Sequence, residues 1–141
     1  MTKFTDLGIS ESTVERLNSK GITEPTEVQV KSIPQIKKGK DVLVESETGS
    51  GKTLGFSLPL IEAISGDKPM ALILSPTREL AKQISKEIDK FGSEDINLAT
   101  IYGGVSYDPQ RKALQDANIV VGTPGRVLDL LKQGDIDLSE L

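Results

Sequence analysis

The chain has 141 residues, of which 36% are hydrophobic and 27% charged, and this is the composition of one globular domain with a buried core. Its 17 basic and 21 acidic residues give a net charge of −4, so any nucleic acid must be held by local groups. It contains neither Cys nor His, which excludes disulfides, thiolate metal sites and a histidine base. No apolar run approaches the roughly 20 residues of a membrane span, and the chain starts with polar residues, so we expect a cytoplasmic protein without a membrane segment.

The first part of the chain, residues 1–40, is expected to form helices. Ile9, Ser10 and Val14 fit a hydrophobic staple around a serine cap, and Gly21 would end the helix that follows.

A second helix is predicted to begin at Thr26, because Thr26-x-x-Gln29 has the form of a capping box. Pro34 lies inside this helical pattern and Pro59 inside a later one, and each should kink or restart its helix.

An apolar run at residues 41–44 has the length of a buried strand, and the eight residues after it have the pattern of a phosphate-binding loop. Those eight residues are Ser46, Glu47, Thr48, Gly49, Ser50, Gly51, Lys52 and Thr53. Gly49 and Gly51 allow the tight turn that aims backbone N–H groups at phosphate oxygens. Lys52 adds a positive charge at the β- and γ-phosphates, and the Thr53 hydroxyl can bind Mg²⁺, so the loop predicts a nucleoside triphosphate with magnesium.

Further short apolar runs alternate with segments of helical spacing, which predicts a parallel sheet flanked by helices over residues 41–141. The runs are residues 42–44, 70–74, 98–101 and 119–121, and because none of them alternates with polar residues, we expect each to be covered on both faces. The clearest helical spacing is that of Leu80, Ile84, Ile88 and Phe91.

Four further strings narrow the choice among proteins with a phosphate loop. They are Gly21-Ile22-Thr23-Glu24-Pro25-Thr26-Glu27-Val28-Gln29 with Phe4 upstream, Pro76-Thr77-Arg78-Glu79-Leu80-Ala81, Gly103-Gly104 and Thr123-Pro124-Gly125-Arg126. In this order and spacing, and over essentially the whole chain, they resemble the N-terminal part of the first RecA-like lobe of the DEAD-box ATP-dependent RNA helicases.

The resemblance implies an adenine site at the start of the chain. Gln29 would hydrogen-bond the adenine edge, because a carboxamide offers both a donor and an acceptor, and Phe4 would pack against the base. Other readings stay open for both residues. Gln29 can serve only the capping box begun by Thr26, and Phe4 can be a core aromatic that anchors the terminal segment.

The resemblance also implies contacts with the sugar-phosphate backbone of RNA, which carry no sequence information. The residues concerned are Pro76, Thr77, Arg78, Glu79, Gly103, Gly104, Thr123, Pro124, Gly125 and Arg126. Purely structural roles remain possible for these residues: a helix start at Thr123-Pro124, a turn at Gly103-Gly104, and a solvated first helical turn at Arg78-Glu79. The low aromatic content, 4%, suits recognition of the RNA backbone better than stacking on bases.

Two residues of the phosphate loop depart from the family pattern. Ser46 stands where Gly or Ala is usual, and Glu47 stands where Gln is usual. The carboxylate of Glu47 should weaken ATP binding by repulsion unless it points away or pairs with a base such as Lys52 or Arg78.

The 141 residues contain no Asp-Glu-Ala-Asp motif, no Ser-Ala-Thr motif and no second lobe with arginine fingers. Since hydrolysis needs those groups, we interpret the chain as a helicase fragment that binds ATP, Mg²⁺ and RNA without hydrolysis, and whose partners are the rest of lobe 1 and a second RecA-like lobe. In such lobes the strands of the two absent motifs lie between residues 42–44 and 70–74. We therefore expect these two strands to be unpaired with each other and the polypeptide to continue beyond Leu141.

Two rival functions remain at this stage. One is another enzyme with a phosphate loop, although the Asn-Lys-x-Asp string expected of a GTPase is absent. The other is a non-enzymatic module that binds RNA or a partner and uses ATP as a structural ligand.

Overall fold

The computed structural model describes residues 1–141, and the chain divides into two compact units. The first unit comprises Met1–Ala63 with Lys90–Gly92, and the second comprises Ile64–Asp89 with Ser93–Leu141. The phosphate loop thus lies with the N-terminal helices, whereas the sequence placed it with the strands after residue 40. The reason is that its attachments run to neighbouring helices and not to a sheet.

Helices make up the regular structure of the first unit. They are the 3₁₀ helix η1 (Phe4–Leu7) and the α-helices α1 (Glu11–Ser19), α2 (Glu27–Lys37) and α3 (Lys52–Ala63). The α2 and α3 helices pack against each other, and a Cβ built at Gly55 of α3 would lie 2.8 Å from Ser32 Oγ of α2. The apolar core of this unit contains Phe4, Leu7, Ile9, Leu17, Ile33, Leu54, Leu58 and Ile61.

The predicted helix ends of the first unit are confirmed. Ser10 caps α1 by accepting a hydrogen bond from the Thr13 N–H, and Gly21 follows the end of α1 with a left-handed φ of 81°. Pro34 and Pro59, expected to kink or restart their helices, each lie inside one continuous helix, so neither restarts its helix.

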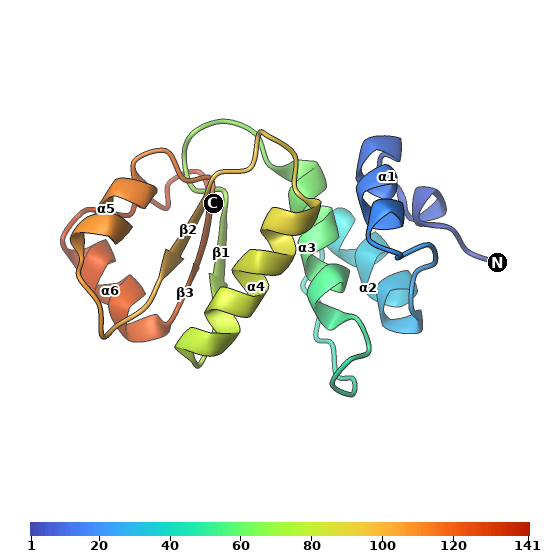
Figure 1. Ribbon diagram of the computed structural model, residues 1–141, viewed down its shortest axis with the longest axis horizontal. Helices are drawn as coiled ribbons and strands as arrows, with labels where there is room; N and C mark the ends of the chain where they lie inside the picture. The colour runs from blue at the N-terminus through green and yellow to red at the C-terminus, as the bar shows by residue number, and fades with distance from the viewer. The chain divides into compact units, whose positions relative to one another are not determined.

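The second unit is built on a three-stranded parallel sheet in the order β1-β3-β2 (Figure 1). The strands are β1 (Ala71–Leu74), β2 (Leu98–Ile101) and β3 (Ile119–Gly122), which confirms three of the four predicted strands. The α4 helix (Arg78–Phe91, whose last two residues belong to the first unit) joins β1 to β2, α5 (Asp108–Leu114) joins β2 to β3, and α6 (Pro124–Lys132) follows β3.

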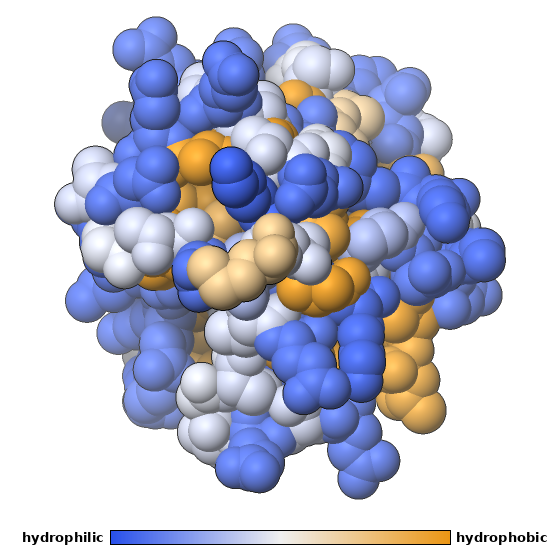
Figure 2. Space-filling model, turned by 90° about the vertical axis from the view of Figure 1, so that its right-hand side faces the viewer, coloured by the Kyte–Doolittle hydropathy of each residue, from blue (hydrophilic) through white to orange (hydrophobic).

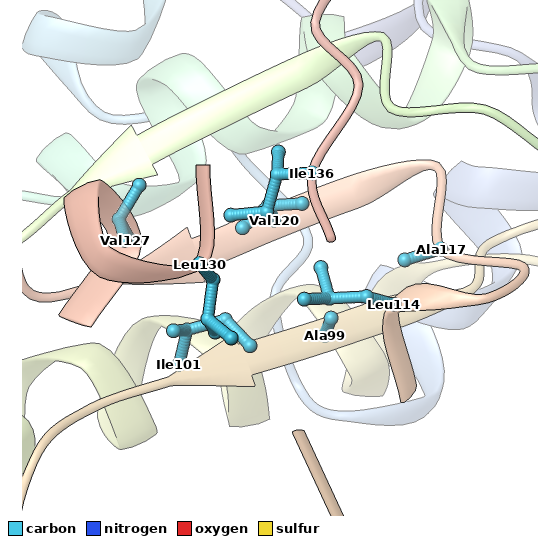
Figure 3. Packing of buried hydrophobic residues seen from close by; sticks show 8 residues of the cluster. All are labelled: Ala99, Ile101, Leu114, Ala117, Val120, Val127, Leu130 and Ile136. Atoms are coloured by element: carbon cyan, nitrogen blue, oxygen red, sulfur yellow. The ribbon is translucent and has the colours of Figure 1, made fainter. Parts of the chain in front are cut away.

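Helices cover the two faces of this sheet. On one face, α5 and α6 pack on β2 and β3 around the cluster shown in Figure 3, which consists of Ala99, Ile101, Leu114, Ala117, Val120, Val127, Leu130 and Ile136. On the other face, the Thr100 hydroxyl of β2 donates to Ser85 Oγ of α4 at 2.7 Å. The fold class expected from the sequence, a parallel sheet flanked by helices, is confirmed.

Residues 42–44 do not form the predicted buried strand. No strand pairs with them, and Leu43 is 97% exposed. A parallel strand is stable only where neighbours take up its backbone N–H and C=O groups, and no strand of the sheet pairs with these residues. As expected, these residues do not pair with β1, whose last residue, Leu74, is itself 54% exposed.

Burial of the other strands differs in part from the prediction. All of β3 is buried, as expected of the central strand, but β1 and β2 each keep residues that are only half-buried because each lies at an edge of the sheet.

None of the helices is both long and apolar enough to cross a bilayer, and the face of the molecule in Figure 2 is mainly hydrophilic with separate small apolar areas.

Candidate functional site

The loop between residues 46 and 52 has the backbone shape that the sequence predicted. Gly49 and Gly51 adopt left-handed φ angles of 83° and 93°, which side chains other than glycine rarely tolerate. At Gly51 a Cβ would also lie 2.5 Å from Gln29 Nε2. The requirement for glycine at this position is therefore both conformational and steric.

A cavity of about 550 Å³ opens between this loop and the start of α2. Its lining combines the loop with the first turn of the helix: Thr26, Glu27, Val28, Lys31, Glu45, Ser46, Glu47, Thr48, Gly49 and Ser50. The hydrogen bond and charge of Lys31, whose Nζ lies 2.7 Å from Glu27 Oε1, hold the pKa of the Glu27 carboxyl below its ordinary value. The cavity thus carries a neutralised acid–base pair on its helical side.

Lys52, at the first position of α3, turns its ammonium group back over the loop. It donates to the carbonyl oxygen of Ser46 and to that of Glu47 at 3.0 Å. Its positive charge is therefore held by neutral carbonyls and has no carboxylate partner. A phosphate oxygen would be a stronger, charge-assisted acceptor at the same place.

The remaining loop side chains also bear on ligand binding. Ser50 Oγ is buried without any hydrogen-bond partner, so the loop contains a polar group whose partner the protein does not supply. Glu47 is exposed, and its carboxylate pairs with neither Lys52 nor Arg78, which pairs instead with Glu79 at 3.7 Å. The chain has no cluster of three or more acidic side chains that could hold a metal.

Gln29 forms the capping box and also holds the phosphate loop. Its Oε1 accepts from the Thr26 backbone N–H at 2.9 Å, and its own N–H donates to Thr26 Oγ1 at 3.4 Å. Its Nε2 donates to the carbonyl of Gly51 at 3.1 Å. The hydrogen bonds with Thr26 confirm the predicted capping box. Gln29 is 2% exposed, and Phe4, which is 1% exposed, lies in the core of the first unit.

In the second unit, the predicted RNA-facing strings follow the ends of the three strands. Because β1, β3 and β2 are parallel, residues 75–78, 123–126 and 102–104 lie at one edge of the sheet. Backbone hydrogen bonds of 2.9 Å from Ser75 N to the Gly122 carbonyl and from Thr123 N to the Ile101 carbonyl continue the register into these loops. The strings, separated in sequence, are thus brought together by the sheet.

Most of these residues are free to meet a ligand. Pro76, Thr77, Arg78, Glu79, Gly103, Gly104, Pro124 and Gly125 are exposed, and Thr123 is half-buried. Arg78 reaches the glycine pair, since its Nη1 would lie 3.2 Å from a Cβ at Gly104. Thr77 Oγ1 accepts from the Leu80 N–H at 3.1 Å, so this hydroxyl is already used at the start of α4.

Arg126 does not lie as the sequence suggested. It is 9% exposed, and its guanidinium donates to Gln110 Oε1 at 3.2 Å and to the Val105 carbonyl at 3.0 Å. Sequence reasoning missed Gln110 and Tyr107, which surround this group. A buried glutamine carries no local pattern, so only the tertiary contacts reveal it.

Comparisons with known proteins agree with this geometry. Residues 26–141 match the DEAD/DEAH box helicase family. The chain is 46% identical over 145 residues to an ATP-dependent RNA helicase, DeaD, of Escherichia coli strain K12, covering 99% of this chain and 23% of that protein. It is 42% identical to a probable ATP-dependent RNA helicase of Methanocaldococcus jannaschii, covering 98% of this chain and 38% of that protein.

Two solved structures share the fold. A DEAD box protein from the hyperthermophile Methanococcus jannaschii superposes with a TM-score of 0.94 at 41% identity, over 100% of this chain and 40% of that one. A hypothetical ATP-dependent RNA helicase from Sulfolobus tokodaii gives a TM-score of 0.86 at 40% identity, over 94% of this chain and 39% of that one. The chain therefore spans less than half the length of these relatives.

Proposed function

The chain belongs to the DEAD/DEAH box helicase family, and we propose that it forms the ATP- and RNA-binding N-terminal part of an ATP-dependent RNA helicase. The observation that carries the proposal is the phosphate loop with its left-handed Gly49 and Gly51, its inward-turned Lys52 and the adjoining cavity of about 550 Å³. The names of the relatives supply the expected activity of the whole protein.

The phosphate loop would hold the triphosphate by three kinds of contact. Backbone N–H groups beside Gly49 and Gly51 would bind the phosphate oxygens, and the positive end of the α3 dipole would favour the same anion. Lys52 would exchange its two carbonyl acceptors for β- and γ-phosphate oxygens. Thr53 would direct its hydroxyl to Mg²⁺, whose charge neutralises the phosphates when it is bound.

Gln29 retains the hydrogen-bonding capacity that adenine recognition needs. Its Oε1 has a second lone pair and its Nε2 a second hydrogen beyond those used with Thr26 and Gly51. The proposed contact with adenine therefore does not require the capping box to break. For Phe4, whose ring is buried in this structure, we propose packing behind the base.

RNA is proposed to lie along the edge where the three strands end. The exposed loops there offer backbone amides and the side chain of Arg78, which suit phosphate oxygens and do not read bases. In the whole protein, the rest of lobe 1 and a second RecA-like lobe would complete the site, so that ATP and RNA together close the lobes and separate a short duplex. The cytoplasmic location expected from the sequence remains a prediction, which cell fractionation would check.

A competition assay tests the proposed nucleotide. A fluorescent ATP analogue is bound to the chain in the presence of Mg²⁺, and unlabelled ATP or GTP is then added. We expect ATP to displace the analogue at concentrations at least about tenfold lower than GTP, because only adenine matches the Gln29 amide. Equal displacement by the two nucleotides would favour another kind of nucleotide-binding protein, and no binding of the analogue would contradict the proposal.

A further inference from the structure

Arg126 is a buried cation that faces away from solvent. It is 9% exposed and forms no ion pair with a carboxylate. Its guanidinium carbon lies 3.9 Å from the centre of the Tyr107 ring, and its two hydrogen bonds go to Gln110 and to the Val105 carbonyl. A planar guanidinium that stacks on a ring and donates two hydrogen bonds is held rigidly, and a lysine could not reproduce this geometry.

Gln110 extends these contacts to the other side of the glycine pair. It is 6% exposed, and while its Oε1 accepts from Arg126, its Nε2 donates to the Tyr102 carbonyl at 2.9 Å. Tyr102 and Val105 flank Gly103 and Gly104 in the chain. The carbonyls on both sides of the glycine pair are therefore fixed to one guanidinium, directly at Val105 and through Gln110 at Tyr102.

The glycine pair makes no backbone hydrogen bonds of its own. Both Gly103 and Gly104 are exposed. Gly104 holds a left-handed φ of 84°. Two glycines without backbone hydrogen bonds sample many conformations unless their flanks are held, and their free N–H groups can receive a phosphate only in a fixed orientation.

We propose that Arg126 is a positioning residue, which holds the Gly103–Gly104 backbone ready for an RNA phosphate through Val105 and Gln110 and does not bind the phosphate itself. The proposal rests on the proposed binding of RNA at this edge of the sheet. It replaces the direct phosphate contact that the sequence suggested for Arg126.

Four substitutions distinguish positioning from direct contact. Gln110→Ala removes the link to Tyr102 at a buried residue, Arg126→Lys keeps the charge but loses the two-point geometry, and Arg126→Gln loses both. Gln110→Glu is a gentler variant, because a carboxylate still accepts from Arg126 but cannot donate to the Tyr102 carbonyl. Gln115→Ala, an exposed glutamine directly after α5, is the matched control.

The first measurement is the order of the 103–105 backbone amides, read from their ¹⁵N relaxation in the chain without RNA. We expect order parameters of about 0.85 for these amides in the unaltered chain and below about 0.6 in Gln110→Ala, Gln110→Glu and Arg126→Lys, with the β3 amides unchanged as proof of folding. Gln115→Ala should leave them unchanged. Unaltered order parameters of these amides in the folded Gln110 and Arg126 variants would overturn the inference whether or not the chain binds RNA.

The second measurement is binding of a single-stranded oligouridine at several salt concentrations. Positioning predicts that Gln110→Ala and Arg126→Lys each weaken binding by about tenfold without changing the salt slope. If Arg126 binds a phosphate directly, Arg126→Lys should bind nearly as wild type, Gln110→Ala should have no effect, and Arg126→Gln should lower the slope by about 0.7. Absence of RNA binding by the wild-type chain would instead contradict the proposed function, and the order parameters of the 103–105 amides would still decide the role of Arg126.

Discussion

Lys52 is the residue on which nucleotide affinity should depend most strongly. Its ammonium group is the only full positive charge within the loop, and in the structure it is held by the carbonyls of Ser46 and Glu47. These neutral acceptors keep the charge at the place where phosphates would bind. Because Lys52 is in no ion pair, a phosphate would not have to displace a carboxylate.

Lys52→Ala is expected to remove most of the ATP affinity and leave the fold intact. Loss of one charge-assisted contact should cost about 1.5 to 3 kcal/mol, which is about a 10- to 150-fold rise in the dissociation constant. Titration calorimetry with ATP and Mg²⁺ measures the change, and Lys40→Ala, at an exposed lysine before the loop, is the control. Unchanged ATP binding by the folded Lys52 variant would refute the assignment of the phosphate loop.

Glu47→Gln is expected to tighten ATP binding, most clearly at low ionic strength. The Glu47 carboxylate is exposed, lines the same cavity and has no ion-pair partner, so its negative charge acts on the phosphates without compensation. The dissociation constant for ATP with Mg²⁺ at two salt concentrations tests this. Weaker binding by the variant would mean that Glu47 helps to organise the loop or the metal.

At the scale of elements, the start of α2 and the phosphate loop act as one piece. The Gln29 side chain accepts from the helix at Thr26 and donates to the loop at Gly51 from a position that is 2% exposed. A nucleotide that contacts the start of α2 would therefore also affect the phosphate loop, and the reverse. No residue pattern indicated this second bond, although it links segments only 22 residues apart.

Gln29→Ala is accordingly expected to lower stability as well as base preference. Truncation removes two part-buried hydrogen bonds, one from the Thr26 N–H and one to the Gly51 carbonyl, which should reduce the free energy of unfolding by about 1 to 3 kcal/mol. Urea denaturation measures this loss, and Gln35→Ala, on the same helix without a side-chain hydrogen bond, is the control. A variant that is destabilised yet still prefers ATP over GTP would restrict Gln29 to its capping role.

At the scale of the whole chain, binding and hydrolysis are expected to separate. The phosphate loop and the strand-end loops lie in different compact units, and neither unit has a cluster of acidic side chains that could hold a metal. The resemblance to DEAD-box helicases assigns the catalytic carboxylates and arginines to motifs that these 141 residues do not contain.

The chain should therefore bind ATP without releasing phosphate, in the presence or absence of RNA. Radiolabelled ATP with Mg²⁺ and a structured RNA provides the test, and the Lys52→Ala variant supplies the background. Phosphate release above that background would show that this chain assembles a hydrolytic site from other residues.

Local patterns in the sequence determined much of this protein. Glycine spacing in the phosphate loop, the Ser10 and Thr26 caps, and the apolar runs of β1, β2 and β3 each depend on neighbours a few residues away, and the structure confirms them. The family resemblance had the same basis, since its motifs are short strings.

Only the tertiary structure decided the fate of residues 42–44 and of Arg126. An apolar run becomes a strand only where partners take up its backbone groups, and the β1-β3-β2 sheet leaves residues 42–44 exposed. Likewise, an arginine binds whichever acceptors surround it, and Arg126 meets Val105, Tyr107 and Gln110. Those contacts join residues 16 to 21 positions apart, which no local pattern encodes because the packing of α5, α6 and the β2–α5 loop brings them together.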